Sequence, residues 1–151
     1  MIKNCMKRDV FFISNSDSIR QAAEKIVKHR IGLLPVVDEQ HKLIGVVRLS
    51  DILALELPDF FNLIPDLDFV HDFGAVETTR PLAKELDRPI TTIMQPVTTV
   101  EETCGLLRAY AIMLKHNMYD IPVISEDGSL VGIASRVDIA VEILSAWKAV
   151  E

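Results

Sequence analysis

The chain has 151 residues, of which 49% are hydrophobic, with a formal net charge of −6 and a mean hydropathy of +0.25. This length and apolar content suit one folded globular protein, and the acidic balance disfavours nucleic acid and anionic membranes as partners, because both attract basic surfaces. No apolar stretch is long enough to cross a membrane, and the N-terminus lacks the apolar segment of a signal peptide. A soluble, cytoplasmic protein is therefore predicted.

The sequence contains two similar segments. An offset of 87 aligns residues 8–55 with residues 95–142 without a gap, and eleven positions are then identical. Lys and Arg outnumber Asp and Glu only in the first third of the chain, so the middle and the end differ from it in charge. We predict three parts: a first repeat over residues 1–55, an apolar and acidic connector over 56–88, and a second repeat over 89–151.

The first half of each repeat is typical of a short extended piece followed by a helix of about four turns. Apolar residues recur at helical spacing over residues 19–27, and residues 106–114 show the same stripe. Residues 16–18 (Ser-Asp-Ser) and 101–103 (Glu-Glu-Thr) are helix N-terminal signals, so both helices are expected to begin directly after them.

The second half of each repeat is typical of two strands and a final helix. β-branched apolar runs at 33–37 and 121–124 are each followed by a polar turn and a second apolar strand. Asp51 and Asp138 then stand at the entry to the final helices. The order predicts an α+β fold of two pseudo-symmetric β-α-β-β-α repeats packed sheet to sheet. The connector, residues 56–88, is too apolar for a flexible linker and is expected to pack on the pair or on a partner subunit.

Both repeats share a motif: an apolar-Pro-Val run, a turn, an apolar-Gly-apolar strand and an Asp six residues after that Gly. The second copy, residues 132–138 (Gly-Ile-Ala-Ser-Arg-Val-Asp), also has a Ser three residues after the Gly, where the first copy has Arg48. The chain thus resembles a tandem cystathionine-β-synthase-type (CBS) domain pair.

The resemblance implies a regulatory, non-enzymatic module that needs no cofactor. Its expected ligand is an adenosine-containing molecule such as AMP, ADP, ATP or S-adenosylmethionine, bound in the cleft between the repeats. It also implies a homodimer that senses cellular energy or metabolite levels. Because the chain shows no output domain, the effector is expected to be a separate protein, whose identity the sequence does not reveal.

The residues after the second strand of each repeat are the candidates for ribose and phosphate recognition. Asp138 and Asp51 can each accept two hydrogen bonds from a ribose diol, or can instead cap backbone N–H groups at a helix start. Ser135 and Arg136 are candidates for a phosphate near the helix N-terminus, where the dipole favours anions. Arg48 can hold a phosphate farther out, with a solvated surface arginine as the alternative.

One position departs from the pattern that similar proteins follow. They often carry basic residues two and three positions before the strand proline, and this chain has Gly32-Leu33 and Tyr119-Asp120 there. Since an acid opposes a phosphate, Asp120 is expected to weaken the binding of polyphosphates. The ligand with more phosphate charge is expected at the Asp51 site, because Arg48 and the basic balance of the first repeat favour it there.

The adenine base needs an apolar slot, which the resemblance implies is built crosswise by the segments that open the repeats. At the Asp51 site the predicted walls are Thr92, Ile93, Met94 and Val97. At the Asp138 site they are Cys5, Met6, Lys7 and Val10. Further wall candidates are Leu33, Gly45, Val46, Ile121, Gly132, Ile133 and Tyr119, the last either stacking on the base or belonging to the core.

Two other functions stay open on the sequence alone. One is an assembly scaffold whose clefts are vestigial, favoured by Arg48, Asp120 and the apolar connector. The other is an enzyme or metal-binding protein, although no phosphate-loop, zincin or hydrolase motif occurs. Cys5 and Cys104 are expected to be free thiols. The candidate metal ligands all lie in the connector: Asp66, Asp68, His71 and Asp72.

Overall fold

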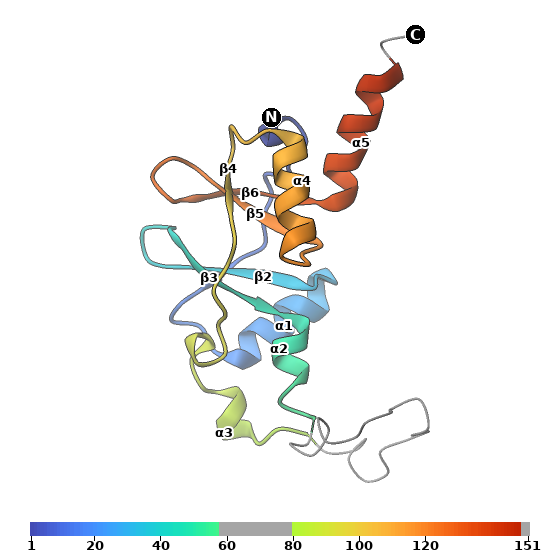
Figure 1. Ribbon diagram of the computed structural model, residues 1–151. Coiled ribbons are helices and arrows are strands. Elements are labelled where there is room, and N and C mark those ends of the chain that lie inside the picture. Colours follow the sequence, from blue (N-terminus) through green and yellow to red (C-terminus); the bar gives the residue numbers. More distant parts are fainter. Residues whose placement is uncertain (58–79, 149–151) are drawn as a thin grey trace, which may run out of the picture.

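The computed structural model describes residues 1–57 and 80–148 as two similar units, each with a three-stranded sheet (Figure 1). The first unit contains β1 (Ile13–Ser14), α1 (Ile19–His29), β2 (Leu33–Val37), β3 (Leu43–Arg48) and α2 (Leu49–Leu53). The second contains β4 (Val100–Glu101), α4 (Leu106–Lys115), β5 (Asp120–Ile124), β6 (Leu130–Ser135) and α5 (Arg136–Trp147). Between or before them lie η1 (Ile2–Asn4), α3 (Ala83–Leu86) and η5 (Ile90–Thr92). The predicted β-α-β-β-α order is confirmed in both repeats.

The two sheets have the same topology and register. The short first strand is parallel to the middle strand, and the middle strand is antiparallel to the last one. Pro35 pairs with Val46 in the first sheet, and Pro122 pairs with Ile133 in the second. The middle strands are almost entirely buried, which explains their continuous apolar runs.

The first helices of the two repeats, α1 and α4, begin differently. At α1, the hydroxyl of Ser18 accepts a hydrogen bond from the Gln21 amide (3.2 Å), and the Gln21 side chain accepts one from the Ser18 amide (2.7 Å). This is a capping box, and it is where the sequence signal predicted it. The signal at residues 101–103 was wrong: Glu101 belongs to β4, and α4 starts at Leu106 after Gly105, with no side-chain cap. Pairing with β5 keeps Glu101 extended.

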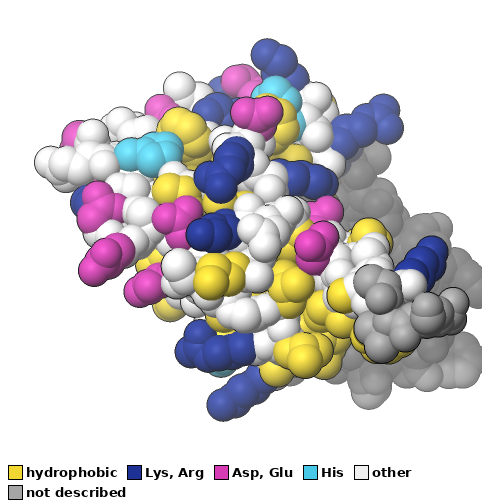
Figure 2. All heavy atoms as spheres, turned by 90° about the horizontal axis from the view of Figure 1, so that it is seen from above, with side chains coloured by type: hydrophobic (Ala, Val, Ile, Leu, Met, Phe, Trp, Pro, Cys, Tyr) yellow, Lys and Arg dark blue, Asp and Glu magenta, His cyan; other side chains and the backbone are white. Residues whose placement is uncertain are grey.

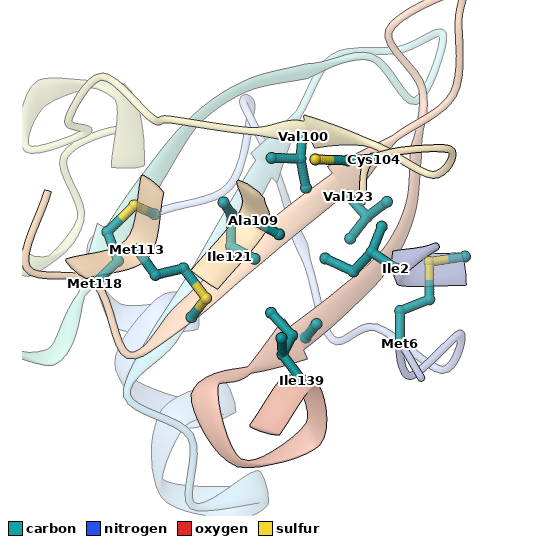
Figure 3. Close-up of a cluster of buried hydrophobic side chains, with 11 residues drawn as sticks. Ile2, Met6, Val100, Cys104, Ala109, Met113, Met118, Ile121, Val123 and Ile139 are labelled. Carbon is teal, nitrogen blue, oxygen red and sulfur yellow. The ribbon is translucent and has the colours of Figure 1, made fainter. Parts of the chain in front are cut away.

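The opening segment of each repeat crosses to the other repeat and pairs with its last strand. The Ile2 amide donates to the Cys104 carbonyl (2.8 Å), and Lys7 exchanges two backbone hydrogen bonds with Ile133 (2.8 and 2.9 Å). In the opposite direction, Gln95 exchanges two with Val46 (2.8 and 3.0 Å). The crosswise arrangement places Ile2 and Met6 inside the hydrophobic core of the second unit (Figure 3).

Both cores are therefore built from segments distant in sequence. The second core consists of Ile2, Met6, Val100, Cys104, Ala109, Met113, Met118, Ile121, Val123, Ala134 and Ile139. The first consists of Ile13, Ile19, Ala22, Leu34, Val36, Val47 and Ile90. Full burial of one large aliphatic side chain contributes about 1.5–3 kcal/mol, so each opening segment stabilises the repeat that it crosses.

The turns of the two hairpins also join the units, and they lie next to each other in Figure 1. The Leu43 amide donates to the Gly128 carbonyl (3.1 Å), and the Leu130 amide donates to the His41 carbonyl (3.2 Å). The Lys42 ammonium lies 2.9 Å from a carboxylate oxygen of Asp127. These contacts fix the relative position of the repeats at the turn end of the sheets.

Replacing Ile2 tests the exchange of opening segments. Ile2→Ala should lower the free energy of unfolding by about 2–4 kcal/mol, because it leaves a cavity in the core of the second unit. The control is Leu82→Ala, which removes the same kind of side chain where it is 59% exposed and should change stability by less than about 0.5 kcal/mol. Chemical denaturation measures both. Equal effects of the two variants would contradict the placement of Ile2.

Candidate ligand-binding site

A cavity of about 310 Å³ lies where the two units meet, and we call it the Asp138 pocket. Three stretches of the chain form it: the segment after η1, the link between α1 and β2, and the ends of β5 and β6 with the start of α5. Its lining residues are Lys7, Asp9, Val10, Phe11, Arg30, Ile31, Gly32, Leu33, Asp120, Ile133, Ser135 and Asp138. The structure thus brings together six predicted site residues, namely Lys7, Val10, Leu33, Ile133, Ser135 and Asp138.

Asp138 and Ser135 form a capping box at the start of α5. The Ser135 hydroxyl accepts from the Asp138 amide (3.0 Å), and the carboxylate oxygen Oδ2 of Asp138 accepts from the Ser135 amide (2.9 Å). Both residues therefore cap the helix, which was the alternative that the sequence raised. Capping uses only some of the hydrogen-bonding positions of each side chain. A carboxylate offers about four lone-pair positions, and the hydroxyl that accepts still has its proton to donate. The pair can cap the helix and bind a ligand together.

Asp120 lies beside this pair. It is the β5 residue directly opposite Ser135 of β6, and it is partly buried. Burial raises the pKa of the Asp120 carboxyl, the positive charge of Lys7 lowers it, and the negative charge of Asp138 raises it further, with a raised pKa as the net result. Three carboxyl groups therefore line the Asp138 pocket, those of Asp9, Asp120 and Asp138, and the charge of Asp138 acts against ionisation of Asp120.

The corresponding turn of the first repeat has different chemistry. The Arg48 amide donates to Oδ2 of Asp51 (2.7 Å), which is half of a capping box. The other half is missing because a guanidinium has no acceptor atom. The helix that follows, α2, has 5 residues, whereas α5 has 12. Asp51 is partly buried at this turn.

A second cavity, of about 430 Å³, opens beside the first, and we call it the Tyr119 pocket. It is lined by Gly32, Leu33, Arg48, Leu49, Ser50, Asn117, Met118, Tyr119 and Asp120. Gly32, Leu33 and Asp120 line both cavities, so they separate the two pockets. Arg48 faces the Tyr119 pocket, and Asp51 is not among the residues that line it.

Arg136 is not in either lining set, although the sequence made it a phosphate candidate. Its Nε donates to the Met118 carbonyl (2.6 Å), and its guanidinium lies 4.6 Å from the centre of the Tyr119 ring. A further nitrogen is 3.4 Å from the Met113 carbonyl. The carbonyls after α4 attract the cation because a helix C-terminus is electronegative. Arg136 therefore holds one face of Tyr119, whose side chain is 69% exposed.

Several predicted wall residues are buried in the interior instead of lining the pockets. Ile121 is fully buried in the core of the second unit, and Val46 is fully buried although it belongs to neither core. Gly45 and Gly132 are buried under the opening segments, against Met94 and Met6.

The predicted walls from the opening segment of the second repeat lie outside both pockets. Ile93 and Met94 pack on the first core, and Val97 is partly buried. Thr92 is exposed, and its hydroxyl donates to the Pro89 carbonyl (2.7 Å).

The pseudo-symmetry changes register in the opening segments. Lys7 and Gln95 make the equivalent strand contacts and are 88 positions apart, whereas β1 and β4 are 87 apart. The first repeat therefore has one residue more between its crossing point and its first strand. That longer connection supplies Asp9, Val10 and Phe11 to the Asp138 pocket. The gap-free alignment at 87 hid this difference.

Arg30 is a pocket residue that the sequence analysis missed. It ends α1 in a left-handed conformation, with φ of 52°, and lines the Asp138 pocket. Asp9, Phe11, Ile31 and Gly32 were missed as well. The available signal was position: all five belong to the two links that join a crossing segment or a helix to a strand, where ligand-binding residues concentrate.

Other predicted features can be placed only in part. Within residues 1–57 and 80–148, no group of three His, Cys, Asp or Glu side chains could hold a metal ion, and no helix is long and apolar enough to span a membrane. Asp66, Asp68, His71 and Asp72 lie outside the described residues. Both cysteines are free, and burial, followed by Glu142 and Asp138, raises the pKa of the Cys5 thiol. Figure 2 shows Lys and Arg interspersed with Asp and Glu on the face seen from above.

Comparison with known proteins agrees with this architecture. The profile of the CBS domain matches residues 2–57 and 86–145, so the chain belongs to the CBS domain family as a tandem pair. It is similar to CBSX1, a chloroplastic CBS domain-containing protein of Arabidopsis thaliana, with 32% identity over 86% of this chain and 57% of that protein. It is also similar to an uncharacterized protein, MJ1426, of Methanocaldococcus jannaschii, with 27% identity over 92% of this chain and 88% of the other.

Among solved structures, the crystal structure of CBSX2 in complex with AMP matches with a TM-score of 0.70. The identity is 25%, and the match covers 96% of each chain. The chain spans 57% of the length of the curated CBSX1 sequence, so the likeness concerns the CBS pair.

The raised pKa of Asp120 predicts a pH-dependent effect on stability. The folded state holds the Asp120 proton more tightly than the unfolded state, so stability is lost as pH rises from the usual Asp pKa through the raised one. Asp120→Asn removes this penalty and should raise the melting temperature more at pH 7 than at pH 4. Thermal unfolding of both proteins at the two pH values measures the difference.

Asp127→Asn is the control with the opposite sign. Its hydrogen bond from Ser125, together with Lys42, lowers the pKa of Asp127, so its charged form stabilises the folded state above the usual Asp pKa. This variant should lower the melting temperature by nearly the same amount at pH 4 and pH 7, because the stabilisation is lost only as pH falls below 4 through the lowered pKa of Asp127. If Asp120→Asn has the same effect at both pH values, Asp120 does not carry the penalty.

Proposed function

We propose that the protein is a regulatory module that binds an adenosine-containing ligand in the Asp138 pocket and signals to a separate partner protein. The observation that carries this proposal is the position of Ser135 and Asp138: both belong to the family motif, both cap α5, and both line a cavity to which the two repeats contribute. The AMP complex of CBSX2, a protein of the same fold and 25% identity, supports the choice of ligand class.

Each group in the pocket has a role that its chemistry allows. The carboxylate of Asp138 accepts hydrogen bonds from the ribose hydroxyls while Oδ2 keeps its bond to the Ser135 amide. The hydroxyl of Ser135 donates to the 5′ side of the ligand. Val10 and Ile133 form apolar walls for the base. In the neighbouring Tyr119 pocket, Arg48 would take a phosphate, and the open face of Tyr119 would stack on a base.

Ligand binding can shift the arrangement of the repeats because the pocket contains residues of both. Leu33 comes from the first repeat, Ser135 from the second, and Lys7 from the segment that crosses between them. A ligand changes the balance of two arrangements only through its different affinity for them. The site meets this requirement, since a movement between the repeats alters the contacts that one ligand makes.

Titration calorimetry with adenosine, the group that all the candidate ligands share, tests the proposal. Asp138→Asn keeps an oxygen for capping but loses the charge, and a hydrogen bond to a charged group is worth about 1.5–3 kcal/mol, so adenosine affinity should fall roughly ten- to a hundredfold. Asp51→Asn makes the same change in the first repeat and shows which repeat binds. AMP, ADP, ATP and S-adenosylmethionine complete the panel.

The same titration separates the alternative function, a scaffold that binds no ligand. Nucleotide-free wild-type protein that is folded yet gives no heat with any member of the panel would favour the scaffold. Adenosine binding that is unchanged in both Asp138→Asn and Asp51→Asn would contradict the ribose role of these residues.

We further propose that the protein is a homodimer that uses the outer face of α5. This face carries Val137, Val141, Leu144 and Trp147, spaced three or four residues apart, with exposed fractions of 68%, 56%, 47% and 66%. A stripe of large apolar side chains on one helix marks an interaction surface. The α5 helix projects from the body of the molecule in Figure 1, where a second copy can reach it.

Val141→Glu tests the dimer, because an unpaired charge in the centre of an apolar contact is strongly unfavourable. Sedimentation analysis should show a dimer for the wild type and at least about a tenfold weaker association for Val141→Glu. Leu82→Glu, which places the same charge at an exposed leucine outside α5, should leave the dimer intact. A wild-type monomer at micromolar concentration would contradict the proposal.

The cellular compartment and the effector protein stay predictions. The sequence favours the cytoplasm, whereas the name of CBSX1 assigns that relative to the chloroplast. The unidentified effector would recognise the ligand-bound arrangement of the repeats.

A further inference from the structure

The two repeats differ in charge at one pair of equivalent positions. In the second repeat, Asp120 stands opposite Ser135 across the last two strands. In the first repeat, the equivalent pair is Leu33 opposite Arg48. The pseudo-symmetry therefore places an acid beside a hydroxyl in one repeat and a leucine beside a guanidinium in the other.

The carboxylate of Asp120 is close to the place where a ligand would meet Ser135. Residues directly opposite on antiparallel strands have their Cβ atoms about 5 Å apart and point to the same side of the sheet. Both side chains line the Asp138 pocket. A 5′ substituent that accepts a hydrogen bond from the Ser135 hydroxyl must therefore lie within reach of the Asp120 carboxylate.

Lys7 compensates the charge of Asp120 only in part, and Asp138 adds a second negative charge nearby. The net result of burial and these two charges is a carboxyl at Asp120 that is less acidic than usual. Arg30 and Lys7 also line the pocket, but both are exposed, so water screens their charges. Asp120 is partly buried and is screened less.

Resting on the proposed function, we propose that Asp120 makes the Asp138 pocket select adenosine ligands whose 5′ substituent is neutral or positively charged, and reject 5′-phosphates. An ammonium or sulfonium at the 5′ position would face both Asp120 and the hydroxyl of Ser135, which can accept as well as donate. A phosphate would meet the carboxylate directly. Asp120 also lines the Tyr119 pocket, but there the guanidinium of Arg48 supplies a positive charge for a phosphate, so the two pockets can hold chemically different adenosine ligands.

Three probes that differ only at the 5′ position test the selection: adenosine, 5′-amino-5′-deoxyadenosine and AMP. Calorimetry at neutral pH compares their affinities, and the binding that Asp138→Asn removes is assigned to the Asp138 pocket. In the wild type this binding should be at least about tenfold weaker for AMP than for adenosine, because like charges at a binding site are strongly unfavourable. The aminonucleoside should bind more tightly than adenosine.

Asp120→Asn keeps the shape of the side chain and removes its charge. The ratio of AMP to adenosine affinity should rise at least about tenfold in this variant, and the advantage of the aminonucleoside should disappear. Asp9→Asn is the matched control, since Asp9 lines the same pocket but is exposed, and it should change the ratio less than about threefold.

The outcomes separate this inference from the function on which it rests. If adenosine binds through Asp138 and Asp120→Asn leaves the ratio unchanged, the selection by Asp120 is wrong and the proposed ligand site stands. Equal wild-type affinities for AMP and adenosine in that pocket overturn the selection as well. If Asp138→Asn removes no adenosine binding, the proposed site and the selection both fail.

Discussion

The close crossing of each opening segment over the last strand of the other repeat determines much of this structure. At the crossing points a Cβ atom on Gly45 would lie 2.9 Å from the carbonyl oxygen of Gln95, and one on Gly132 would lie 3.1 Å from that of Lys7. Only glycine allows the two backbones to approach this closely. The crossing inserts Met6 and Met94 above the strands, completes both cores and closes one side of the Asp138 pocket. The glycine of the motif is therefore a packing residue, and the pocket depends on it indirectly.

The symmetry of the backbone contrasts with the asymmetry of the chemistry. Both hairpins share the same register, and both units bury equivalent strands, so the frame is repeated almost residue by residue. The two repeats differ at positions where neither strand pairing nor core packing requires a particular side chain. One extra residue lengthens the link before β1, Arg48 stands where the second repeat has Ser135, and Leu33 stands where it has Asp120. Each change alters the lining of a pocket, and none of these residues belongs to a core.

Sequence alone predicted the features that depend on local patterns. The β-α-β-β-α order recurs in both repeats, and the Ser18 cap and the turn containing Ser135 and Asp138 each occur in one of them. The failures concern competition between partners. The acids at 101–103 were assigned to a helix start, but Glu101 is extended and pairs with Ile124 of β5. Arg136 was assigned to a phosphate, but the carbonyls after α4 and the ring of Tyr119 hold its guanidinium. The partner that a residue takes depends on which groups lie near it in the folded protein, and a single sequence does not show which partner is preferred.

The position of the Asp138 pocket also explains how a small ligand could act on a structure that is so firmly joined. The hairpin turns and the crossing segments hold the repeats together at two places, through the Lys42 contact with Asp127 and through backbone hydrogen bonds at Lys7 and Gln95. The pocket lies beside the point where Lys7 pairs with Ile133. Its other wall comes from the end of α1, where Arg30 adopts a left-handed conformation. A ligand there contacts the crossing segment and both repeats at once. Its binding energy therefore acts on the joint between the repeats, and a ligand held within either repeat alone would have no such effect.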